Sequence, residues 1–202
     1  MAKDLAERRG VETEVYQPAE DSHLLAETAV ADLAACSDES ASGGLALEVG
    51  TGSGYVAEQV AAETDCDVVA SDLNPHACRQ ARERSTHGVS VVRADLVSPF
   101  ADGVFDAVLF NPPYLPEDAA AARDDWMEVA LTGGEDGRAV VDPFLDSVGR
   151  VLSSDGAVYL LVSSLTGVDE VVDRAAENGF SAVALRDESF PFETLTVLKL
   201  VR

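Results

Sequence analysis

Three acidic residues stand at or near the ends of short apolar stretches along the chain. Glu48, Asp72 and Asp95 each close a run rich in Val, Ala and Leu that has the composition of a buried strand. Open α/β sheets bind their ligand beyond the carboxyl ends of the strands, so the three carboxylates are predicted to share one crevice. Carboxylates there favour a cationic ligand and repel a pyrophosphate.

A glycine-rich turn, EVGTGSG (48–54), follows the first of these acids. Gly50 and Gly52 let the backbone pass close to a ligand and adopt positive φ angles. A dinucleotide fingerprint would require a third glycine where Tyr55 stands, and the lysine of a phosphate-binding loop is absent. The turn therefore predicts a small-molecule site that differs from both nucleotide-binding patterns.

S-adenosylmethionine (SAM) fits this combination because it carries a sulfonium, an ammonium and an adenosine. Asp72 stands about twenty residues after the turn, where a carboxylate commonly binds the ribose. Asp95 could accept the adenine amino group, and Glu48 would accommodate the positive charge. The alternative is that Asp72 and Asp95 only cap the segments that follow them.

The stretch LFNPPYLP (109–116) ends a fourth apolar run in an asparagine, two prolines and a tyrosine. The Asn111 side-chain oxygen and the Pro112 carbonyl can accept the two N–H groups of a planar amide or aromatic-amine nitrogen. Pro112 and Pro113 would hold those acceptors rigidly, and Tyr114 could cover a flat face of the substrate. An ordinary turn is the alternative, since Asn-Pro is a common loop signal.

Strands that alternate with helices must position these residues. The pattern predicts one domain over 1–202, with 1–14 partly mobile, and an α/β fold of the Rossmann-like class I SAM-dependent methyltransferase type. Its seven-stranded sheet should be mostly parallel, with an antiparallel last strand and helices on both faces. Predicted strands cover 45–50, 67–72, 89–95, 104–111, 156–164, 180–189 and 193–201. Predicted helices cover 18–35, 74–85, 138–154 and 167–179, and the stretch 51–64 is predicted as a glycine turn that leads into a further helix.

The composition restricts the setting and the partners. The net charge is −23, from 14 basic and 37 acidic residues, and the acids form no long block. This excess is typical of proteins that work at high salt, and it disfavours sequence-independent binding to nucleic acid. Three cysteines without CxxC spacing, no metal-ligand spacing and no signal-peptide pattern predict a reduced, cytoplasmic protein without a metal site.

Several segments together resemble one family, the short HemK-like glutamine methyltransferases of eukaryotes and archaea. The resemblance runs from about Val15 to the C-terminus, and the high acid content suggests a halophilic archaeon. NPPY is shared with amino-methyltransferases that act on nucleic acids, whereas YxPAEDS and GGxxGRxVxDxF are far more specific. The matching segments are VYQPAEDSHLL (15–25), LEVGTGSG, SDLNPHA (71–77), ADL (94–96), FNPPYLP, TGGEDGRAVVDPF (132–144) and ETLTVLKL.

The resemblance implies a SAM-dependent enzyme that methylates the side-chain nitrogen of the glutamine in the GGQ motif of the class I translation termination factor. Catalysis would rest on Asn111, Pro112 and Tyr114, and the substrate glutamine would be held by Asn111, Pro112, Pro113, Tyr114 and Leu115. SAM would be bound by Ser22, Glu48, Gly50, Gly52, Asp72, Asp95, Leu96 and Asn111.

The family also implies a heterodimer with a small zinc-binding activator subunit. That subunit would add a strand to the sheet edge near Val89–Arg93. Two alternatives stay open for the substrate: an adenine or other amino group of nucleic acid, and a protein lysine, for which no base is evident. The chain departs from the family at Leu131-Thr132, where Trp-Ala is common, and its tryptophan, Trp126, lies upstream of this pair.

Overall fold

The computed structural model describes residues 15–36, 44–115 and 130–202. The proposed mobile segment 1–14 and Trp126 lie outside these ranges. The helices are α2 (Glu20–Cys36), α3 (Tyr55–Glu63), α4 (Pro75–Arg84), α6 (Val141–Val151) and α7 (Val168–Glu177), and the strands are β1 (Leu45–Val49), β2 (Asp67–Asp72), β3 (Ser90–Arg93), β4 (Phe105–Phe110), β5 (Leu152–Ser163), β6 (Ser181–Ser189) and β7 (Thr194–Val201).

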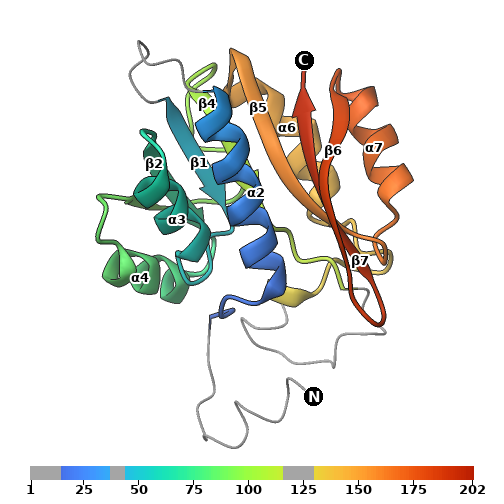
Figure 1. Ribbon diagram of the computed structural model, residues 1–202, viewed down its shortest axis with the longest axis horizontal. Helices are drawn as coiled ribbons and strands as arrows, with labels where there is room; N and C mark the ends of the chain where they lie inside the picture. Colours follow the sequence, from blue (N-terminus) through green and yellow to red (C-terminus); the bar gives the residue numbers. More distant parts are fainter. Residues whose placement is uncertain (1–14, 37–43, 116–129) are drawn as a thin grey trace, which may run out of the picture.

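The strands form one seven-stranded sheet in the order β3-β2-β1-β4-β5-β7-β6 (Figure 1). The pairs from β3 to β5 are all parallel, whereas β7 runs antiparallel to both of its neighbours. The predicted mostly parallel sheet with an antiparallel last strand is therefore confirmed. Strand order reverses beside β1, which is where a doubly wound sheet opens a crevice for its ligand.

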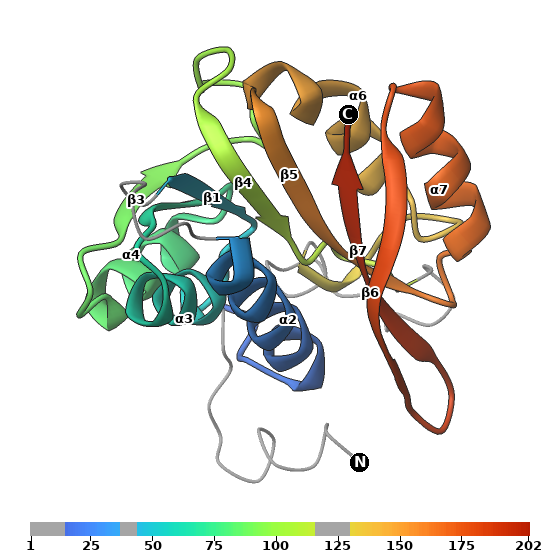
Figure 2. The same cartoon turned by 45° about the horizontal axis from the view of Figure 1, so that its top comes forward.

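Helices cover both faces of the sheet (Figures 1 and 2). On one face, Leu24 and Leu25 of α2 and Val56 of α3 are buried in an apolar cluster with side chains from the central strands. On the other face, Phe144 of α6 and Val171 of α7 belong to a second cluster. Each helix thus buries one apolar side against the sheet, and burial of such side chains supplies most of the driving force for this arrangement.

The ends of several elements differ from the predicted ones. β3 stops at Arg93, two residues before Asp95, and β5 starts at Leu152, directly after α6. α6 begins only at Val141, so Pro143 is its third residue. The first backbone N–H groups of a helix have no intrahelical partner, which is why this proline costs no hydrogen bond.

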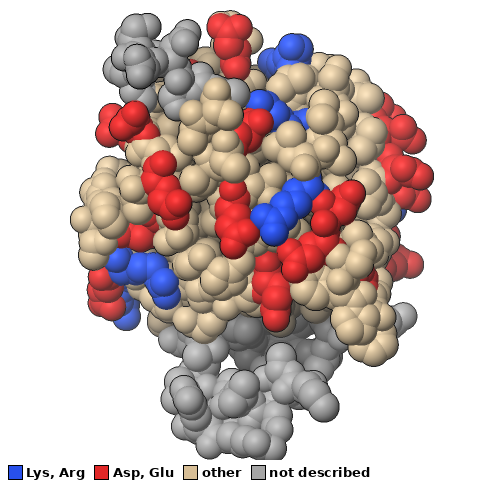
Figure 3. Space-filling model, viewed as in Figure 1, with Lys and Arg blue, Asp and Glu red and all other residues tan. Residues whose placement is uncertain are grey.

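Three further features bear on the setting of the protein. Cys66 and Cys78 are free thiols. None of the helices in the described ranges combines the length and apolar character that crossing a membrane requires. Acidic side chains are scattered over the face seen in Figure 3, with few basic ones between them.

Candidate active site

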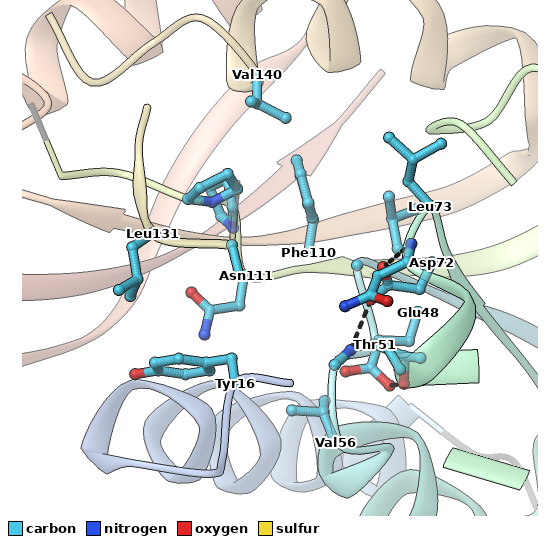
Figure 4. A pocket seen from close by; sticks show the side chains of 18 of the residues that line it. Tyr16, Glu48, Thr51, Val56, Asp72, Leu73, Phe110, Asn111, Leu131 and Val140 are labelled. Carbon is cyan, nitrogen blue, oxygen red and sulfur yellow. Dashed lines mark hydrogen bonds between the residues drawn. The ribbon is translucent and has the colours of Figure 1, made fainter. Parts of the chain in front are cut away.

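A pocket of about 450 Å³ opens beyond the carboxyl ends of β1, β2 and β4 (Figure 4). Strand register brings its central residues level with one another, because Val49 pairs with both Ser71 and Phe110. The residue after each of these strand positions therefore faces the same space. Every residue that the sequence predicted for the site lines this pocket: Ser22, Glu48, Gly50, Gly52, Asp72, Asp95, Leu96, Asn111, Pro112, Pro113, Tyr114 and Leu115.

The glycine turn depends on left-handed backbone at alternate positions. Gly50, Gly52 and Gly54 have φ angles of 65°, 51° and 80°. A Cβ atom on Gly54 would stand 2.7 Å from the Cα of Ala81 in α4, so this glycine permits close packing of α3 on α4. A Cβ atom on Gly50 would stand 3.3 Å from the Phe110 ring and one on Gly52 3.5 Å from the Tyr16 carbonyl oxygen, so the first two glycines line the pocket side of the turn and the third permits helix packing.

The side chain of Glu48 is buried beneath this turn. Its Oε2 accepts hydrogen bonds from the Thr51 hydroxyl (2.5 Å) and the Ala57 backbone N–H (2.9 Å). Burial raises the pKa of Glu48 to about 8, although these two hydrogen bonds act in the opposite direction. The carboxyl group thus anchors the turn to α3, in addition to facing the pocket as the sequence predicted.

Asp72 closes β2 with its carboxylate held on both oxygens. Oδ2 accepts the Gly52 backbone N–H (2.9 Å) and Oδ1 accepts the Asn74 backbone N–H (2.8 Å). Burial raises the pKa of Asp72, and the hydrogen bonds from Asn74 and Gly52 oppose that shift. Each oxygen keeps a further lone pair, so the group can also accept from a ribose hydroxyl.

Asp95 and Leu96 follow β3 on the far wall of the pocket. Asp95 is exposed, and its backbone carbonyl accepts the Ser98 N–H (3.2 Å) and hydroxyl (2.9 Å). Leu96 has a φ of 46°, the one positive φ at a non-glycine residue in the described chain. Left-handed backbone at such a residue carries strain of about 1–3 kcal/mol and is found most often at binding sites.

Asn111 directly follows β4 and its carboxamide projects into the pocket, across from the ring of Tyr16 (Figure 4). Its Oδ1 is buried and has no hydrogen-bond partner among the described residues. Pro112 is buried behind it, and Tyr114 extends the wall. A buried acceptor without a partner costs about 1–3 kcal/mol, and such an atom is expected to be satisfied by a ligand.

The segment after Pro113 is held by the residues that follow the undescribed stretch 116–129. The Leu115 N–H donates to the Leu131 carbonyl (3.0 Å), and the Gly133 N–H donates to the Leu115 carbonyl (2.9 Å). These two bonds form a short parallel bridge between Leu115 and Thr132. The Leu131-Thr132 pair, at which the sequence departs from the family pattern, is thus the backbone support of the NPPY corner.

The GGEDG segment packs against the same corner. A Cβ atom on Gly137, whose φ is 78°, would stand 2.7 Å from the Tyr114 carbonyl oxygen. The Arg138 guanidinium donates to the Thr166 carbonyl (2.6 Å) and forms an ion pair with Asp136 (2.6 Å). Arg138 therefore ties the loop to the turn after β5.

The structure adds a group that sequence reasoning did not assign to the site. The Tyr16 hydroxyl donates to Asp21 Oδ2 (2.9 Å), and Asp21 Oδ1 accepts the Ser22 backbone N–H (2.6 Å). Burial raises the pKa of both Tyr16 and Tyr114, with the charge of Asp21 adding to the effect, so both phenols stay neutral. An acidic residue in the first turn of a helix is normally explained by its interaction with the helix dipole. For this reason the sequence did not mark Asp21 as a site residue.

The donor set fits a nucleoside that carries a positive charge. The glycine turn lines the pocket, Asp72 can accept ribose hydroxyls, and the Glu48 carboxyl lies beneath the turn, where a bound cation would favour its ionised form. The described residues contain no group of three or more His, Cys, Asp and Glu side chains suited to a metal ion. Fold and pocket together define a class I SAM-dependent methyltransferase.

Comparisons with known proteins support the same class of enzyme. Residues 46–134 match the family model described as a methyltransferase domain. A protein of Methanocaldococcus jannaschii, provisionally named protein N5-glutamine methyltransferase MJ0928, is 34% identical over 94% of this chain and 92% of its own. This chain belongs to the family of HemK-like protein N5-glutamine methyltransferases. It is a methyltransferase whose cofactor is SAM.

Two further relatives differ in what they act on. The solved Mtq2–Trm112 complex of E. cuniculi, described as responsible for methylating the termination factor eRF1, has a TM-score of 0.74 and 29% identity, with 94% of this chain and 99% of that chain covered. The tRNA1(Val) (adenine(37)-N6)-methyltransferase of Aeromonas hydrophila is 31% identical over 68% of this chain and 58% of its own.

Proposed function

We propose that this enzyme methylates the side-chain amide nitrogen of the glutamine in the GGQ motif of the class I translation termination factor. The observation that carries the proposal is the buried Asn111 Oδ1, which lacks a partner among the described residues and lies on the pocket wall. A primary amide supplies the two N–H donors that this oxygen and a neighbouring carbonyl would accept. The relatives named for glutamine methylation support the same acceptor.

The protein's contribution to the reaction is to orient the amide nitrogen of the substrate. SAM, when bound, supplies an electrophilic methyl group, and an amide nitrogen is a weak nucleophile because its lone pair is delocalised. Asn111 Oδ1 and the Pro112 carbonyl accept its two N–H groups and favour rehybridisation. SAM held by the glycine turn and Asp72 would give up its methyl group to this nitrogen and keep the carbon–sulfur bonding pair, and the nitrogen would lose one N–H proton to solvent.

The site suits a neutral acceptor better than a charged one. A lysine would have to lose a proton before attack, and the two phenols on the pocket wall, Tyr16 and Tyr114, stay neutral because burial raises their pKa. Neither can act as a base near neutral pH. We therefore rank a protein lysine below the glutamine amide.

The test is methyl transfer to the intact factor. The enzyme, its activator, SAM and the termination factor are incubated at high salt, and the methyl group is located by peptide mass spectrometry. One added methyl on the GGQ glutamine is expected. An unmodified GGQ peptide, in a sample whose SAM binding is intact by calorimetry, would refute the proposal.

Asn111→Ala should lower kcat about a hundredfold or more, since it removes an acceptor that acts in the transition state. Much of the SAM affinity should remain because Glu48 and Asp72 are untouched. Asn178→Ala is the matched control: this asparagine lies at the end of α7, bonded to Asp146, and outside the pocket lining. Equal kcat values for the two variants would remove Asn111 from the mechanism.

Methylation of an adenine amino group is the second candidate, favoured by the tRNA adenine methyltransferase among the relatives. Both substrates present a planar nitrogen, so the NPPY corner suits either. The charge of −23 disfavours a nucleic acid because phosphate binding relies on basic side chains. Methyl transfer to transfer RNA by the wild-type complex, and none by Asn111→Ala, would establish this activity instead.

We also propose a small zinc-binding activator that adds a strand beside β3. β3 is an edge strand, and its Val92 is 39% exposed. Unpaired edges with exposed apolar side chains are ready sites for strand addition. The relative Mtq2 was solved as a complex with Trm112.

Val92→Asp should weaken the complex with that activator, measured by co-purification, because it places a charge in the added interface. Val183→Asp is the control, since Val183 is exposed on β6, the opposite edge strand. Loss of the activator from Val183→Asp but not from Val92→Asp would locate the partner on the other edge.

We further propose a single cytoplasmic domain from a halophile, in keeping with the acidic composition.

A further inference from the structure

We propose that the tip of the β6–β7 hairpin, residues 190–193, docks the protein substrate beside the pocket. This inference rests on the proposed function, since a glutamine amide on a folded protein can enter the pocket only if the surface around it lies against the pocket rim. The hairpin tip projects beyond the sheet on the side where the parallel strands end (Figures 1 and 2).

The tip presents an aromatic side chain to solvent. Phe192 is 92% exposed, and Leu165, in the turn after β5, is 42% exposed. The backbone joins these turns, because the Ser164 N–H donates to the Thr194 carbonyl (2.9 Å). A Phe side chain left in water forgoes the free energy of burial, which a docking partner would recover.

The tip is also held rigidly. The Phe190 N–H donates to the Glu193 carbonyl (2.7 Å) across the turn. The fully buried Ser163 hydroxyl donates to the Glu193 carboxylate (2.6 Å) and accepts the Leu165 N–H (3.1 Å). An aromatic group on a preorganised turn loses little entropy on binding, which is the usual property of a binding hot spot.

Strand direction puts the tip at the same edge of the sheet as the pocket. β6 is parallel to β5 and β4, because each of β5 and β6 is antiparallel to β7, so the tip lies at the carboxyl edge of the sheet. The charge of Glu193 reaches the Tyr114 phenol, whose pKa it helps to raise. Thr166, next to Leu165, lies 3.5 Å from a Cβ on Gly137, beside the Tyr114 carbonyl.

These features define the chemistry of the partner. The rim near Tyr114 carries the accessible acids Glu20 and Glu193, the charges of which act on Tyr114, whereas Asp21 is buried against Tyr16. A substrate with basic residues beside its glutamine complements this rim, and an apolar recess on the same face would take Phe192. The acceptor is therefore a folded protein with a basic surface around its glutamine, and Phe192 contributes to binding it and not to the chemistry.

The test is a steady-state comparison on the intact termination factor with the enzyme–activator complex. Phe192→Ala should raise the KM for the factor about tenfold with kcat and SAM affinity unchanged, the size expected of a hot-spot truncation. Phe192→Leu should recover most of the affinity. Val104→Ala is the matched control. Val104 is exposed on the turn before β4, at the amino ends of the parallel strands and therefore on the side of the sheet away from the hairpin tip.

The outcomes separate the two proposals. Wild-type enzyme that leaves the factor unmethylated overturns the proposed function and this inference with it. Wild-type activity combined with an unchanged KM in Phe192→Ala overturns the docking inference alone. A lowered kcat, or a lowered melting temperature, in Phe192→Ala would assign the residue to the site or to stability and would likewise contradict docking.

Discussion

At the scale of the residue, Glu48 combines an anchoring contact with a ligand-facing position. Its carboxyl group binds the Thr51 hydroxyl and the Ala57 N–H, and the same group lines the pocket. A buried carboxyl favours its protonated form, so the free protein holds a proton there that a bound cation would displace. We therefore propose that the pKa of this one group couples cofactor binding to pH.

The stability of the free enzyme should reflect this proton. The pKa of Glu48 is about 8 in the folded state, above its ordinary value of 4.5, so the folded state binds more protons between these values. Stability must therefore fall as pH rises through that window, by a few kcal/mol at most. Denaturant unfolding of wild type and Glu48→Gln at several pH values, at constant high salt, would check this.

Glu48→Gln keeps the shape and an acceptor for both donors but cannot titrate. The difference in unfolding free energy between the two proteins should therefore change with pH in the direction just described, while other groups cancel. A difference that stays constant from about pH 5 to about pH 8 would contradict the raised pKa. With SAM present the dependence should weaken, because a bound cation favours the ionised carboxylate.

At the scale of the element, two sequence motifs prove to be one structural unit. The NPPY corner and the GGEDG segment are separated by residues 116–129, yet the backbone of Leu115 bonds both Leu131 and Gly133. Gly137 lies against the Tyr114 carbonyl. The glycine-rich segment thus serves as the support that sets the position of the NPPY corner.

Gly137→Ala should damage this unit twice. The new methyl group would meet the Tyr114 carbonyl at 2.7 Å, and the φ of 78° is unfavourable for alanine. We expect stability to fall by about 1–3 kcal/mol and kcat/KM to fall at least tenfold, because the corner must move. Thermal unfolding and methyl-transfer assays would measure the two effects.

Gly179→Ala separates the two causes. Gly179 has a φ of 83° but nothing within 4 Å of its Cβ position, and it lies after α7. This variant should lose stability from backbone strain alone and keep its activity. Equal activity loss in both variants would show that the Gly137 effect arises from global destabilisation and not from the corner.

At the scale of the whole molecule, the excess of negative charge is the feature that most affects stability. The net charge of −23 comes from acids spread along the chain, as the scattered carboxylates of Figure 3 illustrate. Repulsion among them opposes the compact state, and salt reduces it by shortening the screening length from about 10 Å at 0.1 M to about 3 Å at 1 M.

The melting temperature should therefore rise steeply with KCl between about 0.1 M and 1 M, the range over which screening becomes effective. Scanning calorimetry in KCl and in equal osmolalities of sucrose would distinguish charge screening from general solute exclusion. A variant with several exposed acids changed to amides should show a weaker dependence. A melting temperature independent of KCl would contradict the screening explanation.

Much of the fold could be predicted because each element carries its own signal. Apolar runs bounded by Gly, Pro and Asp marked every strand, and the short connection near Pro191 required the antiparallel last pair. Element ends were less predictable: β5 extends back to Leu152 because pairing with Phe105 of β4 overrides the local turn signal at Gly156. Such pairing is a tertiary contact that no local pattern contains.

The sequence by itself determined which residues surround the pocket, because a polar residue at the carboxyl end of a parallel strand lies at the edge of the sheet where the pocket opens. Glu48, Asp72 and Asn111 were predictable for that reason. Only the tertiary structure decided how they are held: that Glu48 anchors its own turn, that Asn111 Oδ1 is left without a partner among the described residues, and that Arg138 secures a loop. Hydrogen-bond partners distant in sequence depend on strand register and packing, which local composition does not encode.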